Sequence, residues 1–143
     1  GDGVFNVYPI RSVRTKRYKY IRNLLPDYYH TNHSDLLRKD GAGAFWDSWY
    51  KSSKQNIKSE NVILNYHIRP KEEFYDLFLD PLERKPIKNY KKYEDYKLLN
   101  KELINFRKKN RDPLLKKHFK WPKEIQLTPE NAENPEILIN CQD

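Results

Sequence analysis

The stretch of sequence that decides the fold reads Arg69-Pro70-Lys71-Glu72-Glu73-Phe74-Tyr75-Asp76-Leu77-Phe78-Leu79-Asp80-Pro81-Leu82-Glu83. Its central part, 72–79, predicts a β-strand, because aromatic and aliphatic residues occupy both of the faces that alternate with a period of two. Tyr75 belongs to one face and Phe74 to the other. Asp80 and Pro81 suit the first two positions of a type I turn, since Asp bonds the backbone that follows it and Pro fixes φ. The stretch therefore predicts a strand that ends in a tight turn.

The N-terminal part of the chain predicts a β-hairpin. Residues 10–13 and 18–24 have the composition of its two strands, and 15–17 that of its turn. In the second strand Tyr20 lies on a mainly apolar face. Arg22 shares that face, so we expect Arg22 at the edge of the core that the face covers.

Two further elements complete the predicted regular structure. Residues 62–67 predict a third strand, which makes 72–79 the fourth. Residues 90–109 predict a long helix with Asn89 as its N-cap, because apolar and aromatic side chains recur at spacings of three and four. These side chains are Tyr90, Tyr93, Tyr96, Leu99, Leu103 and Phe106. A helix with such a stripe needs a sheet to cover it, so we expect the helix and the strands to pack together.

The segment between the hairpin and the third strand carries weaker signals. Ser34 is a candidate N-cap for a short helix over 35–39, which Gly41 would end. An aromatic group follows at helical spacing and consists of Phe45, Trp46, Trp49 and Tyr50. This group either packs against the body of the domain or contributes to an interface with another domain, where Trp and Tyr are enriched. From Trp121 onward, prolines and few apolar residues predict an extended tail.

The chain has 143 residues, a formal net charge of +8 and an aromatic content of 14%. This length suits one domain with a tail and allows one hydrophobic core, to which the tyrosines are expected to contribute. A basic surface attracts nucleic acid, anionic lipid or sulfated glycans, and charge alone neither chooses among them nor excludes a merely solvated surface. No apolar run approaches the ~20 residues of a membrane span. Cys141 is the single cysteine, so an intramolecular disulfide is excluded.

Two motifs resemble those of a known enzyme family. Residues 69–83 resemble the R-P-x-E-E-L-Y-D-L-x-x-D-P-x-E signature near the end of type I sulfatases. The hairpin Y-P-x-R-S-V-R-T-x-R-Y-K-Y-I of bacterial sulfatases, as in the N-sulfoglucosamine sulfohydrolase (sulfamidase) branch, is similar to residues 8–21. Asp112-Pro113 after the long helix is similar to that branch too, so the resemblance covers roughly 7–113. Lys85-Pro86-Ile87 departs from the Asn-Leu pair that usually follows the D-P-x-E turn.

The resemblance implies an α+β fold of the alkaline-phosphatase-like superfamily, with a small four-stranded antiparallel sheet packed against a long C-terminal helix. This subdomain is expected over 1–113, with 114–143 as an extended tail that docks on it. The parent protein is expected to be periplasmic or secreted. It would hydrolyse sulfate esters or sulfamates of sulfated glycans such as heparan.

The same family uses a formylglycine nucleophile beside a calcium ion. The C/S-x-P-S-R segment that carries the formylglycine does not occur in these 143 residues. The chain is therefore expected to be a C-terminal fragment that completes the substrate cleft and supports the catalytic half. Formylglycine and calcium are expected in an N-terminal catalytic domain, and this chain alone is expected to be inactive.

Tyr8, Arg11 and Arg14 are the candidates for contact with substrate. They lie just after the point where a sulfatase catalytic domain would end, and an Arg fork binds sulfate or carboxylate through two bonds. For Arg11 the competing interpretation is an ion pair with a carboxylate at an interdomain boundary. The other signature residues are assigned structural roles, and they are Arg69, Glu73, Tyr75, Asp76, Asp80 and Pro81.

No residue of the chain is predicted to be catalytic or to bind metal. Nothing in the sequence indicates a pair of carboxylates in a cleft, and His30 with His33 lacks the further ligands that zinc requires. Two alternatives stay open: a free-standing basic module that binds polyanions, and an interaction module built on residues 45–50. Binding of nucleic acid requires aromatic side chains exposed among Lys and Arg. Because most aromatic residues here have the spacing of buried side chains, nucleic acid is the less favoured partner.

Overall fold

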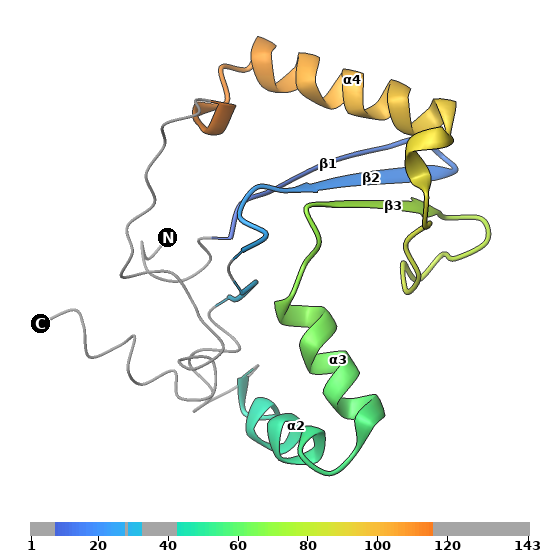
Figure 1. The fold of residues 1–143 in the computed structure, drawn as a ribbon. Helices are drawn as coiled ribbons and strands as arrows, with labels where there is room; N and C mark the ends of the chain where they lie inside the picture. Colours follow the sequence, from blue (N-terminus) through green and yellow to red (C-terminus); the bar gives the residue numbers. More distant parts are fainter. Residues whose placement is uncertain (1–7, 28, 33–42, 116–143) are drawn as a thin grey trace, which may run out of the picture. The chain divides into compact units, whose positions relative to one another are not determined.

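The computed structural model of the chain describes residues 8–27, 29–32 and 43–115. These residues form an α+β structure with a three-stranded antiparallel sheet and three α-helices (Figure 1). The chain divides into two compact units. The described residues of the sheet unit are 9–24 and 70–115, and those of the helical unit are 8, 25–27, 29–32 and 43–69.

The sheet unit contains strands β1 (Ile10–Arg14), β2 (Tyr18–Asn23) and β3 (Glu72–Asp76), all antiparallel and in the order β1-β2-β3. The predicted hairpin is confirmed as β1 and β2. β2 also pairs with β3 over five residues, so that Tyr20 lies opposite Phe74. Directly opposed residues point to the same face of an antiparallel sheet. The register therefore determines which side chains of the two distant segments meet.

The predicted third strand is wrong. Residues 62–67 lie in helix α3 (Ile57–His67), so the sheet has three strands and not four. The side chain of Asn56 begins this helix by accepting a hydrogen bond from the Lys58 N–H at 2.9 Å. A short apolar run fits a strand and a buried helix equally well, and here the capping residue upstream decides for the helix.

The last strand is shorter than the sequence predicts. It ends at Asp76 instead of residue 79, because Asp76 lies opposite Tyr18, the first residue of β2. The Asp76 carboxylate then accepts hydrogen bonds from the N–H groups of Phe78 at 3.0 Å and Leu79 at 3.4 Å. These bonds turn the chain out of the sheet, so the predicted alternation holds only as far as Asp76.

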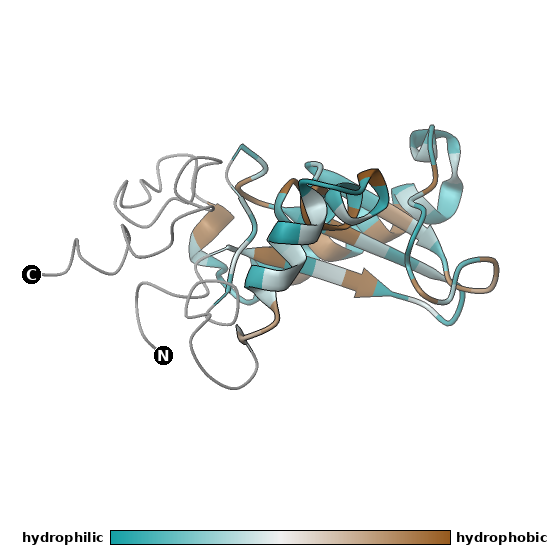
Figure 2. Cartoon of the chain, turned by 90° about the horizontal axis from the view of Figure 1, so that it is seen from below, coloured by the Kyte–Doolittle hydropathy of each residue, from teal (hydrophilic) through white to brown (hydrophobic). Residues whose placement is uncertain are grey.

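Helix α4 (Glu94–Lys109) covers one face of the sheet (Figure 1). The buried core of the unit joins three aromatic residues of the strands to three residues of the helix, and it consists of Tyr18, Tyr20, Phe74, Tyr96, Leu99 and Leu103. Figure 2 shows apolar segments along the strands of this sheet. The prediction that a sheet covers the stripe of the long helix is confirmed.

Two predicted details of the long helix are wrong. Asn89 does not cap it with its side chain; Asn89 has a left-handed backbone with φ of 56° and precedes the 3-10 turn η2 (Tyr90–Lys92), and α4 begins at Glu94. Phe106 belongs to the predicted stripe but is 62% exposed, whereas Arg107 is buried. Arg107 turns inward because the carboxylate of Asp112 binds its guanidinium.

The helical unit contains α2 (Trp46–Ser53) and α3, which pack against each other. The predicted helical spacing of residues 45–50 is confirmed. Trp46 is buried and contacts the ring of Tyr66, whereas Phe45 and Trp49 remain exposed. The predicted helix over 35–39 and nearly all of the predicted tail lie outside the described residues. None of the helices in the described ranges combines the length and the apolar content needed to cross a bilayer.

Candidate functional site

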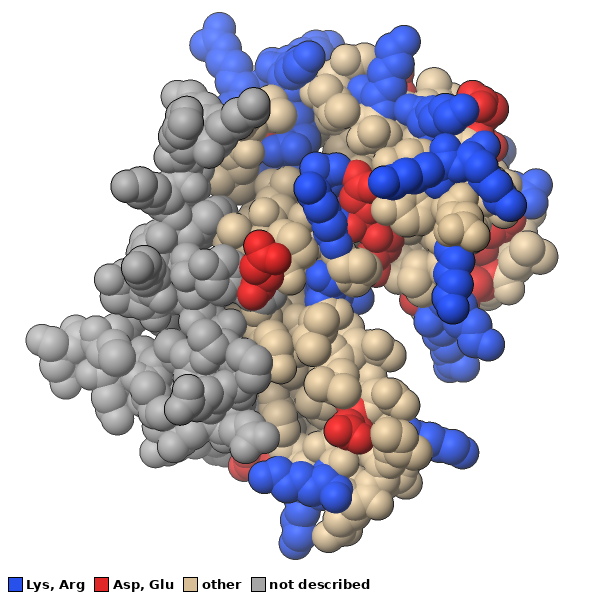
Figure 3. Space-filling model, in the orientation of Figure 1, with Lys and Arg blue, Asp and Glu red and all other residues tan. Residues whose placement is uncertain are grey.

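The hairpin of β1 and β2 supplies cations to four carboxylates of the sheet unit. Each of four hairpin cations binds one carboxylate, and the pairs are Arg11 with Asp112, Arg17 with Asp76, Lys19 with Glu83, and Arg22 with Glu72. Lys and Arg side chains elsewhere in the unit extend into solvent over the α4 side, as Figure 3 shows. The sheet unit therefore presents a surface on which positive charge is in excess.

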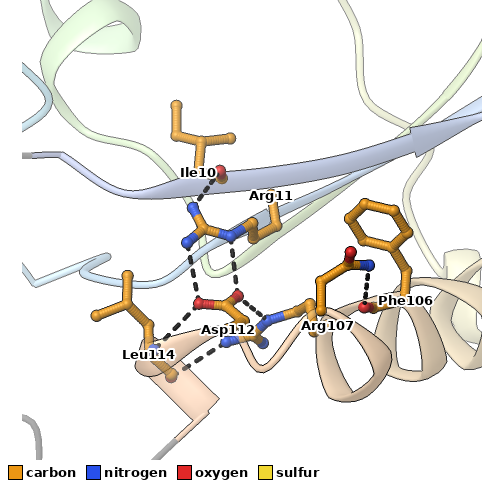
Figure 4. Close-up of polar contacts among 7 residues, drawn as sticks. Ile10, Arg11, Phe106, Arg107, Asp112 and Leu114 are labelled. Carbon is orange, nitrogen blue, oxygen red and sulfur yellow. Dashed lines mark hydrogen bonds and ion pairs between the residues drawn. The ribbon is translucent and has the colours of Figure 1, made fainter.

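Asp112 joins the first strand to the end of α4 (Figure 4). Its carboxylate accepts hydrogen bonds from Nε and Nη2 of Arg11 at 2.9 and 3.0 Å, and from Nε of Arg107 at 2.7 Å. The N–H of Leu114 adds a fourth bond at 3.0 Å. The remaining nitrogen of Arg11, Nη1, donates to the Ile10 carbonyl at 3.0 Å. All three guanidinium nitrogens of Arg11 are thus bound inside the sheet unit.

This Arg11–Asp112–Arg107 clamp is held in its charged form. The hydrogen bonds from Arg11, assisted by those from Arg107, keep the pKa of Asp112 well below its usual range, although burial acts in the opposite direction. The side chain of Asp112 is 6% exposed and that of Arg107 is 9% exposed. Removing one partner of a buried ion pair typically costs about 3–5 kcal/mol, because the other charge is left without compensation. The clamp therefore depends on all three side chains.

A second charged group lies under α4 and centres on Glu72. Its Oε1 accepts a hydrogen bond from the hydroxyl of Tyr20 at 2.9 Å and pairs with Arg22. Its Oε2 accepts hydrogen bonds from the hydroxyls of Tyr90 at 3.0 Å and Tyr96 at 3.2 Å. Strand β2, turn η2 and helix α4 each contribute a donor, so Glu72 links the three elements at one point.

The chemistry of this cluster favours hydrogen bonding over proton transfer. Burial raises the pKa of Glu72, but the hydroxyls of Tyr20 and Tyr90 and the charge of Arg22 outweigh it, so that the pKa lies below its usual value. Burial and the neighbouring carboxylate raise the pKa of Tyr90 to about 12, and burial is also the main reason why the pKa of Tyr20 and of Tyr96 is raised. At neutral pH the carboxyl is ionised and the phenols are protonated. The cluster thus consists of three tyrosine hydroxyls and Arg22, which surround the Glu72 carboxylate as their common acceptor.

Two other signature residues lie on strand β3, and each accepts a hydrogen bond from the β1–β2 hairpin. Glu73 accepts hydrogen bonds from the amide of Asn23 at 2.8 Å and from the hydroxyl of Tyr75. Asp76 accepts from Nε and Nη2 of Arg17 at 3.0 and 2.9 Å, and these bonds lower the pKa of Asp76. Each of these two acidic residues therefore binds a residue of the hairpin of β1 and β2.

Asp80 and Pro81 form the first two positions of a turn, as the sequence predicts. The Glu83 N–H donates to the Asp80 carbonyl at 3.1 Å and closes this turn. The Asp80 carboxylate accepts the Lys85 N–H at 2.7 Å, which lowers the pKa of Asp80. The turn is thus fixed on both sides of Pro81.

The three candidates for substrate contact have different surroundings. Arg11 binds Asp112, a carboxylate of its own unit. Arg14 is exposed at the end of β1 and forms no ion pair with any residue that the structure describes. Tyr8 belongs to the helical unit, where its ring packs edge-on against His30 at 5.1 Å. The structure therefore does not bring the three side chains together within one unit.

His30 belongs to an aromatic group of the helical unit. Its ring packs against Tyr66 at 4.8 Å, and its carbonyl lies 2.8 Å from Nδ1 of the buried His67. The other ring nitrogen of His67 pairs with the hydroxyl of Tyr50. His33, the partner in the H-x-x-H pattern, lies outside the described residues. Arg69 follows α3 directly and is half-buried.

Sequence reasoning missed the roles of Glu72 and Arg107. Glu72 could have been found from its position opposite Arg22. This position is known only once the segments 18–23 and 72–76 are paired as neighbouring strands. Arg107 could have been found from its position five residues before Asp112. At this separation the side chain of Arg107, in the last turn of the helix, reaches the Asp112 carboxylate. Both residues stabilise contacts between elements.

Within residues 8–27, 29–32 and 43–115, no group of three or more His, Cys, Asp and Glu is arranged to hold a metal ion. Compared with protein-family models and with curated proteins, the chain matches none of them.

Proposed function

We propose that the chain is the C-terminal subdomain of a sulfatase that acts on sulfated glycans. In this proposal the catalytic half, with formylglycine and calcium, lies in an N-terminal domain that is not part of these residues. The described subdomain supports that half and completes one side of the substrate cleft. The parent protein is proposed to be periplasmic or secreted.

The observation that carries the proposal is the way the two motifs fit together. Arg22, the residue that directly follows the hairpin motif, lies opposite Glu72 of the C-terminal signature, and the two form an ion pair. Arg17 binds Asp76 in the same pair of strands. A third segment similar to the sulfatase pattern, Asp112-Pro113, binds Arg11. The charged residues of the three segments thus form ion pairs with one another or with the residue next to a motif. These ion pairs are a physical reason why the three segments occur together in one sequence.

Arg14 is the residue proposed to contact the glycan. It is exposed and forms no ion pair within the described residues, so its guanidinium is available for a sulfate or carboxylate group. Arg11 is proposed to position β1, because Asp112 binds it inside the unit. The proposed subdomain thus adds positive potential and one guanidinium to the cleft.

Two experiments test the proposal. The coding sequence upstream of these residues is expected to contain a C/S-x-P-S-R segment, and the isolated chain is expected to leave an aryl sulfate intact. An upstream sequence without that segment refutes the proposal, and so does hydrolysis of the aryl sulfate by the isolated chain.

In the full-length protein, Arg14→Ala is expected to lower kcat/KM for a sulfated oligosaccharide about tenfold, since an exposed charge-assisted contact contributes roughly 1.5 kcal/mol. It is expected to leave kcat/KM for a small aryl sulfate unchanged. Lys101→Ala on the solvent side of α4 is the matched control. Equal losses for both substrates contradict contact with the glycan.

A second candidate is a free-standing module that binds polyanions, and the exposed cations of the sheet unit favour it. The aromatic residues of the sheet do not form a platform for stacking bases, because Tyr18, Tyr20 and Phe74 are buried in the core. Binding of duplex DNA by the isolated chain with a steep dependence on salt, and without binding of heparin-like oligosaccharides, favours this second candidate.

A further inference from the structure

The most exposed apolar side chains of the sheet unit gather in the loop that follows β3. Phe78 is 69% exposed, Leu79 83% and Leu82 66%. Figure 2 shows this loop as an apolar segment at one end of the unit, beyond the strands. Scattered exposed apolar residues are ordinary, but three large ones within five positions of a single loop form a patch. We refer to residues 77–82 as the apolar loop.

The apolar loop has a fixed backbone. Leu77 donates its N–H to the Arg17 carbonyl at 2.6 Å, and Asp80 donates its N–H to the Asp76 carbonyl at 2.8 Å. At the far end, the side chain of Glu83 binds Lys19 at 2.6 Å. Because both ends and the middle are bonded, little backbone entropy is lost when the three side chains become buried.

Cations surround the apolar loop, and the nearby acids are already bound. The guanidinium of Arg17 lies 6.0 Å from the centre of the Phe78 ring. Lys16, Arg84 and Lys85 are exposed and form no ion pair with any residue in the described ranges. Asp76, Asp80 and Glu83, the acidic residues of this end, are all engaged in the bonds given above. The five cations of this end, Lys16, Arg17, Lys19, Arg84 and Lys85, thus outnumber its three acids, so positive charge is in excess around the apolar tip.

The bonds that shape the apolar loop are made by its backbone and by acidic side chains. In the pattern D-L-x-x-D-P-x-E, the positions of Phe78, Leu79 and Leu82 are the three that the signature leaves open. The fixed positions, Asp76, Asp80 and Glu83, supply the bonds that shape the loop. The three exposed side chains take no part in these bonds, so they are open to an interaction.

We propose that the apolar loop binds the surface of an anionic lipid bilayer, with Phe78, Leu79 and Leu82 entering the headgroup region and Lys16, Arg84 and Lys85 contacting anionic headgroups. Phe and Leu beside Lys and Arg are the residues of interfacial membrane binding. A protein hot spot is instead enriched in Trp, Tyr and Arg, and Leu is under-represented there. The charge of the rim selects an anionic surface over a neutral one.

The test is sedimentation of the full chain with vesicles made of equal parts phosphatidylcholine and phosphatidylglycerol. Replacing the three apolar side chains with serine (F78S/L79S/L82S) is expected to lower the partition coefficient at least about tenfold. The double variant R84Q/K85Q is expected to lower it roughly fivefold for each charge removed, and binding to phosphatidylcholine alone is expected to be weak. These substitutions lie on exposed side chains, so circular dichroism is expected to show an unchanged fold.

A matched control removes apolar area elsewhere on the same unit. L98S/F106S replaces two exposed apolar side chains of α4 and is expected to leave the partition coefficient unchanged. A direct readout of insertion is Phe78→Trp, because the emission of the introduced indole is expected to shift to shorter wavelength on vesicles and to be quenched by brominated lipid. The proposal is overturned if the chain does not sediment with anionic vesicles, if the control loses as much binding as the triple variant, or if brominated lipid does not quench the emission of the Phe78→Trp variant.

Discussion

Replacing Asp112 with asparagine tests the clamp directly, because Asn has the same shape and lacks the charge. In the folded chain Asp112 accepts three hydrogen bonds from two guanidinium groups, and its side chain is 6% exposed. In the variant Arg107, which is 9% exposed, and Arg11, which is 32% exposed, lose their only carboxylate partner among the described residues.

The expected loss follows from these exposures. Breaking a buried ion pair costs about 3–5 kcal/mol, and the partial exposure of Arg11 places the loss at the lower end, about 3 kcal/mol. For a unit of this size, each kcal/mol corresponds to roughly 4–8 °C in Tm, so a decrease of about 12 °C or more is expected. Thermal and urea denaturation followed by circular dichroism measure the change. Hydrogen exchange in β1 and in the last turn of α4 locates it, because these segments meet at the clamp.

The matched control is Glu94→Gln, which breaks the exposed pair of Glu94 with Lys97. This variant is expected to change stability by no more than about 0.5 kcal/mol. If D112N changes the free energy of unfolding by less than about 1 kcal/mol, or if it loses no more than the control, the clamp does not stabilise the unit as argued here.

Two further predictions concern pH. The pKa values of Glu72 and Asp112 are lowered in the folded state, so their contribution to stability is present above the unfolded value of about 4 and is lost as the pH falls through the folded pKa values. Urea denaturation at a series of acidic pH values is expected to show this loss, with a smaller effect in D112N, and a flat profile contradicts it. The pKa values of Tyr20, Tyr90 and Tyr96 are raised, so their contribution is present below the unfolded value of about 10 and is lost as the pH rises towards the folded values. Tyrosinate absorbance is therefore expected to rise in two stages, the later one coinciding with unfolding, and a single stage near pH 10 rules out the cluster around Glu72.

The hairpin and the long helix are predictable because their signals are local. β1 and β2 follow from alternation on both sides of a short turn, and α4 follows from a stripe of apolar residues with helical period. Residues 62–67 predict a strand but lie in a helix, because the apolar run at 62–64 is too short to show a period. The hydrogen bond that fixes it, from Lys58 to Asn56, lies upstream of that run.

The contacts of the candidate site are less predictable because they join residues far apart in the sequence. Arg11 and Asp112 are 101 positions apart, and only the packing of α4 on the sheet brings them together. Sequence reasoning gave Arg11 two interpretations, and the structure pairs it with a carboxylate of the same unit. Arg14 is exposed in the structure, and its contact with a glycan stays a prediction.

The pairing of β2 with β3 has an architectural consequence. The Asn23 N–H donates to the Lys71 carbonyl at 3.0 Å, and the Asn23 amide donates to the Pro70 carbonyl at 2.6 Å, so the chain leaves and re-enters the sheet unit at adjacent points. Residues 25–69 thus form an excursion between two hydrogen-bonded strand ends. The entropy of closing such an excursion changes slowly with its length. We therefore expect the register of the strands to survive a change in the length of this segment, which makes it a position for grafting a different module into the same framework.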